Sequence, residues 1–120
     1  MSNLKTSLRM LCNNQDILGG IIITKDGMLI ESYAVENPMA ETLGALMSNV
    51  ALVIKTSLQD LGHQEFNRYV IQSNKGRIYL VDLGKAVLIA LTDLNIELGK
   101  VNMALFQAAN EIKKSGRIDI

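Results

Sequence analysis

Residues 38–62 read PMAETLGALMSNVALVIKTSLQDLG, an amphipathic pattern with a broad apolar side and a second side of small residues. At the ~100° per residue of an α-helix, its large apolar residues fall within one sector of ~140°. These residues are Met39, Leu43, Leu46, Met47, Val50, Val53, Ile54, Leu58 and Leu61. A sector of this width is typical of a helix that covers a β-sheet, so we expect this face to lie in the core.

The other side of the same helix carries small and polar residues around one leucine. They are Glu41, Gly44 (at the edge), Ala45, Ser48, Leu52, Lys55 and Gln59. Small side chains let another backbone come close, so this side is a candidate subunit contact. A single surface leucine is also ordinary. From the residues alone both interpretations of Leu52 stay open.

Length and composition limit the class of protein. The chain has 120 residues, 48% of them hydrophobic and 20% charged, which suits one compact domain over residues 1–120. Lys plus Arg and Asp plus Glu number 12 each. A net charge of zero argues against nucleic-acid and membrane-surface partners. The N-terminus lacks a secretory apolar run, and no stretch reaches the ~18 apolar residues of a membrane span, so we expect a soluble, cytoplasmic protein.

The first half of the chain predicts a helix followed by a strand hairpin. Ser2 can cap a helix that runs to about Asn13. Gly19-Gly20 leads into the β-branched strand 21–24, Lys25-Asp26-Gly27 forms a tight turn, and residues 28–33 return as a second strand. The strand 21–24 is apolar on both faces, which favours a central position.

The second half predicts a helix, three strands and a closing helix. Asn37 and Pro38 can open the long helix and Gly62 can end it. Strand 66–72 has the polar residues of a sheet edge, strand 77–82 follows, and strand 86–91 is apolar enough to lie beside strand 21–23. A last helix runs from about Asn95 to Ser115. The predicted fold is α+β, in the order α-β-β-α-β-β-β-α, with helices on both faces of a five-stranded antiparallel sheet.

Few residues suggest a catalytic, metal or cofactor site. Cys12 shares an apolar helix side with Leu8 and Leu11 and is expected to pack in the core. His63, the sole histidine, follows the long helix, where an imidazole can meet free carbonyls. The aspartates stand at turns and element ends, and GGIIITKDG lacks the spacing of a phosphate loop. We therefore predict no catalytic residue, no metal site and no cofactor.

Four basic residues near the strand turns are a candidate basic patch. Arg68, Arg77, Lys75 and Lys85 could form a small patch beside Tyr69 and Tyr79, although a solvated sheet rim is the usual meaning of such a pattern. Arg68 could also act on a GTPase as an arginine finger. We rank that role below ordinary edge-strand solubility.

The chain resembles the Roadblock family over essentially its whole length. The resemblance is carried by GGIIITKDGMLI, the long helix after it, the strand LGKAVLIAL and the entry to the last helix, NIELGKVNMALFQAANEI. The family includes dynein light chains, Ragulator scaffold subunits and MglB-type regulators of Ras-like GTPases. Its profilin-like domains form non-enzymatic dimers through the long helix and the adjoining edge strand. For the MglB-type branch, the resemblance implies that the paired helices dock a Ras-like GTPase and promote its active geometry without donating a catalytic arginine.

Carried onto this sequence, the resemblance implies an interface on helix 38–62 and strand 66–72. The predicted dimer or partner residues are Glu41, Gly44, Ala45, Ser48, Leu52, Lys55, Gln59, Phe66, Arg68 and Val70. Two functions stay open: a homodimer that modulates the nucleotide cycle of a small Ras-like GTPase, and an adaptor that bridges larger complexes without affecting GTP hydrolysis. A domain that encloses a small ligand is a more distant third.

Overall fold

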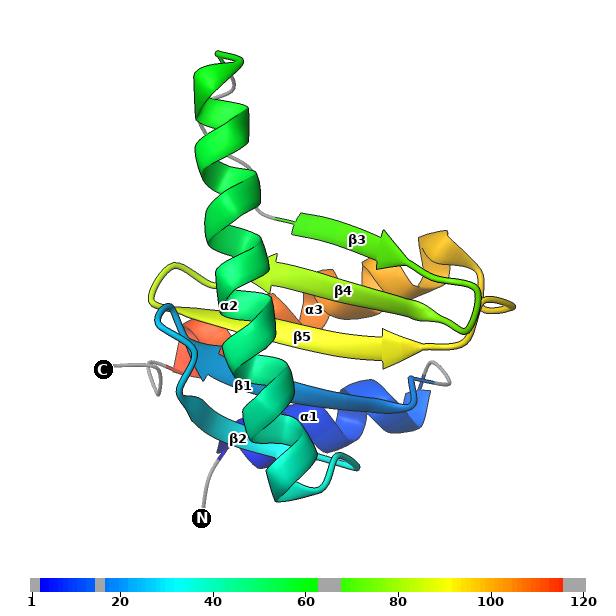
Figure 1. Cartoon of the computed structure of the whole chain (residues 1–120). Coiled ribbons are helices and arrows are strands. Elements are labelled where there is room, and N and C mark those ends of the chain that lie inside the picture. The colour runs from blue at the N-terminus through cyan, green and yellow to red at the C-terminus, as the bar shows by residue number, and fades with distance from the viewer. Residues whose placement is uncertain (1–2, 15–16, 63–67, 116–120) are drawn as a thin grey trace.

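The computed structural model describes residues 3–14, 17–62 and 68–115. Three helices and five strands follow one another in the predicted order (Figure 1). They are α1 (Asn3–Asn14), β1 (Gly19–Thr24), β2 (Leu29–Tyr33), α2 (Asn37–Asp60), β3 (Arg68–Gln72), β4 (Arg77–Asp82), β5 (Ala86–Thr92) and α3 (Leu98–Ser115). The α-β-β-α-β-β-β-α prediction is confirmed.

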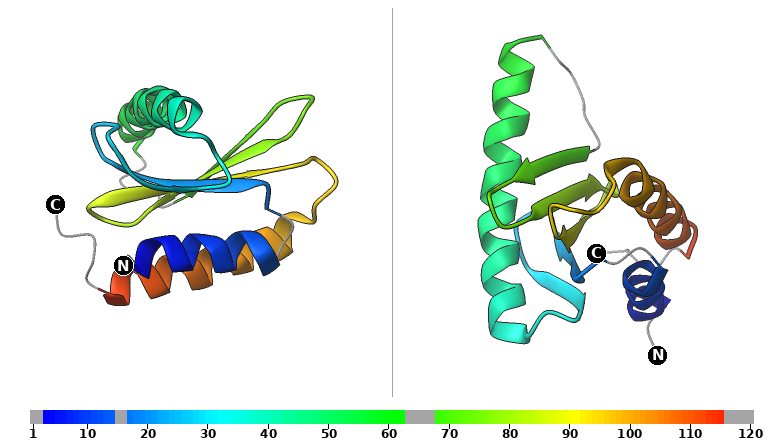
Figure 2. Two further views of the ribbon diagram at one scale, coloured as in Figure 1. Left: turned by 90° about the horizontal axis from the view of Figure 1, so that it is seen from below. Right: turned by 90° about the vertical axis from the view of Figure 1, so that its right-hand side faces the viewer.

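The strands form one antiparallel sheet in the order β2-β1-β5-β4-β3. The apolar strands β1 and β5 lie side by side, with Ile21 opposite Ile89, as their composition predicts. Figure 2 shows three layers, with α2 on one face of the sheet and α1 and α3 together on the other. The five-stranded antiparallel sandwich with helices on both faces is therefore confirmed.

Each face of the sheet has its own apolar core. On the α1 and α3 side, Leu8, Ile22, Tyr79 and Leu105 belong to one fully buried cluster. On the α2 side the buried cluster is smaller and holds Ile21, Ile23, Ala40, Leu80, Val87 and Ile89. Much of the α2 side is only partly buried, which leaves surface there for another molecule to cover.

The predicted core face of α2 is wrong in part. Met39, Leu46, Val53 and Leu61 are exposed, whereas Ala40 and Gly44 are buried. The reason is close packing: where Ala40 and Gly44 meet the sheet, the helix backbone approaches β1 more nearly than a row of leucines would allow. The helix is thereby rotated by roughly 60° from the orientation that its apolar sector alone predicts.

The turn between β1 and β2 also packs closely against α2. Gly27 has φ +99°, and a β-carbon on it would lie 2.7 Å from Ser48 Oγ and 3.3 Å from Ala45 Cα. Lys25 Nζ, in the same turn, lies 2.7 Å from Asp82 Oδ1 at the end of β4. The ion pair ties the turn to the end of β4, and the small residues Ala45 and Ser48 let the turn pack closely against α2.

Some element ends differ from the predictions. The cap of α2 is Glu36 rather than Asn37, and Gly62 follows the helix with φ +91°, as expected of a stop. α3 begins at Leu98 and not at Asn95, because Arg77 Nη1 donates to Ile96 O at 2.7 Å and Ile96 packs against the core, which holds the chain outside the helix there. Ser2, predicted to cap α1, lies outside the described residues.

Candidate functional site

The long helix α2 extends beyond the sheet that it covers. At ~1.5 Å per residue, its 24 residues span ~36 Å. Five strands at ~4.8 Å spacing give a sheet only ~19 Å wide. Figure 1 shows the C-terminal turns of α2 projecting past β3, and Leu61 at the end is exposed. This helix end, which has no sheet beneath it and exposes Leu61, is the first part of the candidate site.

One side of α2 carries an exposed apolar row. Met39, Leu46 and Val53 recur every seventh residue, and Leu46 and Val53 are 55% and 63% exposed. On the helix they lie ~140–180° from Ser48, which faces the β1–β2 turn. The row therefore faces the opposite side, toward the part of the sheet that α2 leaves uncovered (Figure 1). We call these three residues the α2 apolar row.

The uncovered part of the sheet contains a hollow of about 230 Å³. Its apolar lining comes from Ile71 of β3, Ile78 of β4 and Leu91 of β5, all half-buried. Ile71 and Ile78 belong to the cluster on the α2 side of the sheet, so the hollow and the α2 apolar row border the same open region. The hollow, which is lined by β3, β4, β5 and the β3–β4 turn, and the α2 apolar row bound a region between a helix side and a sheet face that we call the apolar corner.

Strand β3 limits this corner at the edge of the sheet. It pairs with β4 on its inner side, and no described strand lies on its outer side. Arg68 and Val70 are exposed, as expected of an edge strand, while Tyr69 donates a long 3.5 Å hydrogen bond to Ala51 O of α2. A strand edge of this kind can pair with another strand.

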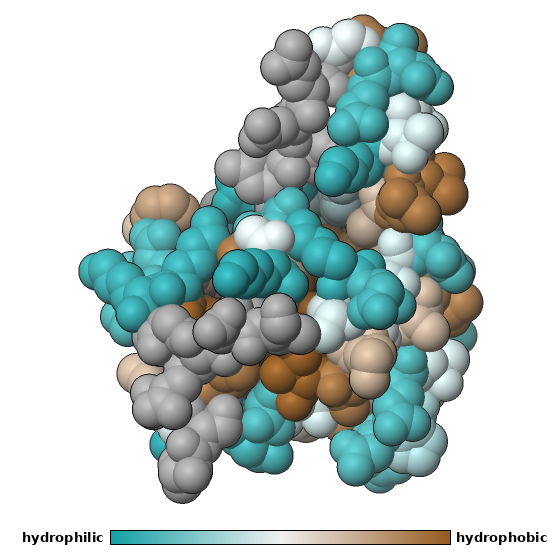
Figure 3. All heavy atoms as spheres, turned by 90° about the vertical axis from the view of Figure 1, so that its left-hand side faces the viewer, coloured by the Kyte–Doolittle hydropathy of each residue, from teal (hydrophilic) through white to brown (hydrophobic). Residues whose placement is uncertain are grey.

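The remaining side of α2 matches the predicted partner face in most positions. Glu41, Ala45, Lys55 and Gln59 are exposed, and Leu52 is 62% exposed. Figure 3 looks onto this side and shows hydrophilic side chains along α2 with a few hydrophobic ones among them. This face is separate from the α2 apolar row, because Leu52 lies ~120° around the helix from Leu46.

Two predicted partner residues of α2 pack inside the protomer instead. Gly44 is buried, so its placement at an exposed edge is wrong: a β-carbon there would meet Ile23 Cγ2 at 2.8 Å. Ser48 is half-buried at the β1–β2 turn. The spacing of small residues predicted a close backbone contact correctly in kind, but the contact is made with the protein's own hairpin. Phe66 lies outside the described residues, as does His63.

The basic patch is not assembled as predicted. Tyr79 is fully buried on the α3 side of the sheet, whereas Tyr69 packs on the α2 side, so the two rings do not share a surface. Arg77 is held by Gln72 Oε1 at 2.9 Å and by Ile96 O. A stacking platform for nucleic acid would need these groups on one face.

The described residues provide few buried groups that could act in catalysis or metal binding. Cys12 lies in the core, and burial raises the pKa of its thiol to about 11, which is opposite to the activation of a nucleophile. Within residues 3–14, 17–62 and 68–115, no three His, Cys, Asp or Glu side chains gather as metal ligands. In the same ranges no helix is long and apolar enough to cross a bilayer.

The described surface thus has an exposed helix side, a hollow in the sheet and an open strand edge. The chain belongs to the Roadblock/LC7 family, whose profile matches residues 5–93. An uncharacterized protein of Methanocaldococcus jannaschii is 29% identical over 97 residues, covering 81% of this chain and 82% of that protein.

Two solved structures show that the fold is shared. MglB of Myxococcus xanthus aligns with a TM-score of 0.88 at 21% identity, over 95% of this chain and 94% of that one. Profilin IB of Acanthamoeba castellanii aligns with a TM-score of 0.64 at 12% identity, over 94% and 98%. The domain is a Roadblock domain with a profilin-like fold.

Proposed function

We propose that the protein is a cytoplasmic, single-domain homodimer that binds a small Ras-like GTPase and modulates its nucleotide cycle, without supplying catalytic residues or a cofactor of its own. The observation that carries the proposal is the apolar corner formed by the α2 apolar row and the hollow at Ile71. Its extent and its position beside an open strand edge suit a second copy of the chain.

The symmetry of such a dimer follows from the open edge of β3. A two-fold axis perpendicular to the sheet beside β3 pairs this strand antiparallel with its copy and joins the two sheets. The same axis keeps the second α2 on the same face of the joined sheet as the first α2 and makes the two helices antiparallel. The projecting end of each α2 then lies over the uncovered sheet of the other protomer.

This arrangement covers the apolar features found in one protomer. The α2 apolar row packs against the other α2, and the exposed Leu61 reaches the region of the hollow at Ile71 and Ile78. Full burial of a leucine or valine side chain contributes up to ~2 kcal/mol. The proposed contact thus moves the subunit interface from the Leu52 face to the Leu46 face of the helix.

The Leu52 face remains available for the GTPase. In the proposed dimer the two α2 helices lie side by side on one surface, and Glu41, Leu52, Lys55 and Gln59 stay in solvent. An exposed leucine among charged and amide groups is a suitable centre for a partner contact. The proposal therefore assigns the two faces of α2 to two partners, one a copy of this chain and the other a GTPase.

The test is GTP hydrolysis by a purified Ras-like GTPase from the same genome, with and without this protein. We expect hydrolysis or nucleotide exchange to accelerate at least about tenfold. Leu52→Arg should abolish the acceleration while the dimer persists. Stable co-elution with unchanged hydrolysis and exchange would instead favour the adaptor function. No complex with any Ras-like GTPase of that genome would contradict the proposal.

A further inference from the structure

Charged side chains are distributed unevenly over the two surfaces of the domain, although the net charge is zero. Helices α1 and α3, which together form one layer, carry five basic residues and a single acidic one, Glu111. The basic residues are Lys5, Arg9, Lys100, Lys113 and Lys114. Helix α2, on the other face of the sheet, carries Lys55 against Glu41 and Asp60. The α1–α3 layer is therefore basic, a property that the overall composition conceals.

Four of these basic residues have no ion-pair partner among the described residues. All five residues are exposed. Lys5 Nζ lies 3.8 Å from Glu31 Oε1 of β2, and the other ion pair of the described residues joins Lys25 to Asp82, outside the layer. The remaining four cations of α1 and α3 are therefore available to an anion from outside the chain.

The basic charge is greatest at one end of the layer. The two helices run antiparallel (Figure 2), so α1 begins beside the end of α3. Lys5 therefore lies at the same end of the layer as Lys113 and Lys114. The exposed residues Asp93 and Glu97 stand at the opposite end, before the first residue of α3.

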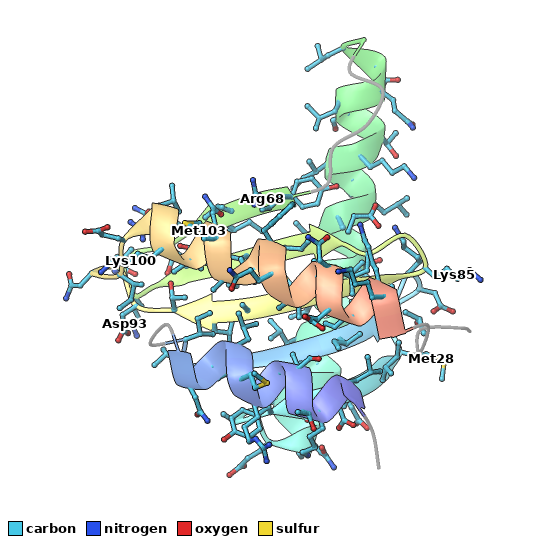
Figure 4. All side chains as sticks on the ribbon, turned by 180° about the vertical axis from the view of Figure 1, so that it is seen from behind. Met28, Arg68, Lys85, Asp93, Lys100 and Met103 are labelled. Atoms are coloured by element: carbon cyan, nitrogen blue, oxygen red, sulfur yellow. The ribbon has the colours of Figure 1, made fainter. Side chains whose placement is uncertain are left out.

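Large apolar side chains stand among these cations on the outer surface of the layer. Met10 of α1 is 56% exposed, and Met103 and Phe106 of α3 are 67% and 63% exposed. Met10 comes two residues after the fully buried Leu8, and Met103 two residues before the fully buried Leu105. Residues two apart on a helix lie ~160° from each other, so both methionines point away from the sheet. Figure 4 shows the layer face-on, with Met103 and Lys100 on α3.

Cations and apolar side chains share one outward side of α3. Lys114 lies ~20° and Lys100 ~60° from Met103 around the helix. This combination is typical of surfaces that lie on a membrane, because cations attract anionic headgroups while apolar side chains enter the boundary between headgroups and acyl chains. A second copy of the same layer would instead bring like charges together.

We propose that the outer surface of the α1–α3 layer is a peripheral docking surface for bilayers that contain anionic lipid. Arg9, Lys113 and Lys114 contact the headgroups, and Met103 and Phe106 enter the boundary region. In the proposed dimer both layers lie on the surface of the joined sheet opposite the α2 pair, so the membrane-bound dimer directs its GTPase face away from the bilayer. The layer belongs to a single protomer, so the inference does not require the dimer.

Sedimentation with vesicles tests the proposal. Vesicles of phosphatidylglycerol and phosphatidylcholine in equal parts should bind half of the protein on the order of 1 mM lipid, and vesicles of phosphatidylcholine alone should bind at least about tenfold more weakly. Raising the NaCl concentration from about 0.1 to 1 M shortens the Debye length from ~10 to ~3 Å and should release the protein from the anionic vesicles.

Charge variants identify the surface that binds. Arg9→Gln combined with Lys114→Gln should weaken binding to the anionic vesicles about tenfold or more, because each cation near an anionic surface adds to the attraction. The matched control is Lys55→Gln combined with Lys75→Gln, which removes the same charge from α2 and from the turn beside the hollow. The control should bind as the parent does.

Tryptophan substitutions report which surface enters the bilayer boundary. The chain contains no tryptophan, so a single introduced indole reports on its own position. In Met103→Trp the fluorescence should shift to shorter wavelength when anionic vesicles are added, because the indole leaves water. In the control Leu52→Trp, on the opposite surface, the emission should not shift.

The outcomes separate this inference from the proposed function. The proposal is overturned if the parent does not sediment with anionic vesicles at ~10 mM lipid, or binds both vesicle compositions equally. A shift in Leu52→Trp without one in Met103→Trp also overturns it, as does tighter binding to a short DNA duplex than to the vesicles. None of these results affects the proposed dimer. Conversely, Leu46→Arg should still bind the anionic vesicles as a monomer, so a monomeric parent would remove the dimer and leave the membrane surface standing.

Discussion

Gly44 of α2 lies so close to Ile23 of β1 that a β-carbon on the glycine would come within 2.8 Å of Ile23 Cγ2. The same β-carbon would lie 3.2 Å from the carbonyl oxygen of Gly27. Ile23 is fully buried and cannot move aside freely. This contact sets the distance between helix and sheet, and it turns the α2 apolar row away from the core.

Gly44→Ala should therefore destabilise the protein by about 1–3 kcal/mol, because overpacking outweighs the better helix propensity of alanine. Urea unfolding followed by circular dichroism measures the change. The control is Gly99→Ala in α3, where the added β-carbon meets no atom within 4 Å. That variant should be as stable as the parent or up to ~1 kcal/mol more stable. Equal free energies of unfolding for the two variants would show that the close contact at Gly44 does not limit packing.

Leu46→Arg should dissociate the proposed dimer, whereas Leu52→Arg should not. An arginine at Leu46 would place a charge between two apolar helices, at a cost of at least ~3 kcal/mol, or more than about 100-fold in Kd. Light scattering at about 10 µM measures the mass of each variant. Dissociation by Leu52→Arg with a dimeric Leu46→Arg would reverse our assignment of the two faces.

Cys12 should make the protein less stable at alkaline pH. Burial raises the pKa of its thiol from 9.0 to about 11, so the folded chain keeps a proton that the unfolded chain loses. The free energy of unfolding should fall as the pH rises from about 9 to 11. Cys12→Ala should flatten this fall. A residual decline at still higher pH is expected from Tyr69, because burial first, and Asp82 second, raise its pKa to about 12.

Thiol labelling provides an independent check on Cys12. An aromatic disulfide reagent at pH 8 should react with the unfolded chain promptly and with the folded chain only at the rate of unfolding. Rapid labelling of the folded protein would contradict the burial of this residue.

Tyr79→Phe should leave stability unchanged or raise it by about 1 kcal/mol. The hydroxyl of Tyr79 is buried and has no hydrogen-bond partner among the described residues, and an unsatisfied buried polar group is unfavourable. Tyr69→Phe is the control, since that hydroxyl donates to Ala51 O and its loss should be neutral or slightly destabilising. Chemical denaturation compares the two. A loss of more than ~1 kcal/mol in Tyr79→Phe would show that the hydroxyl has a partner after all.

The element order and the sheet could be predicted from local signals. The turn at Asp26-Gly27, the β-branched strand at Ile21 and the stop at Gly62 each have a local physical cause, so their positions survive in the structure. The start of α3 could not be read in the same way, because it depends on a hydrogen bond between Arg77 and Ile96, 19 residues apart. Such tertiary contacts leave no periodic pattern in the amino-acid sequence.

The predicted partner residues stay a prediction except for Gly44, which is buried in the protomer, and the core side of α2 could not be read from the sequence. The sequence identified α2 as a helix with two contact faces, but apolar periodicity favours the widest sector as the core. The actual core side was set by Ala40 and Gly44 against β1. A helix longer than the sheet is wide must leave residues at one end without a sheet beneath them, and comparing the two lengths would have indicated the exposed Leu61 beforehand.

The mass of the parent protein in solution distinguishes the proposed homodimer from a single chain. Sedimentation equilibrium at about 10 µM should give twice the chain mass of 13.2 kDa. Leu46→Arg should give the mass of one chain under the same conditions. A parent protein that sediments as a single 13.2 kDa chain would leave the α2 apolar row and the hollow at Ile71 in solvent, and would contradict the account.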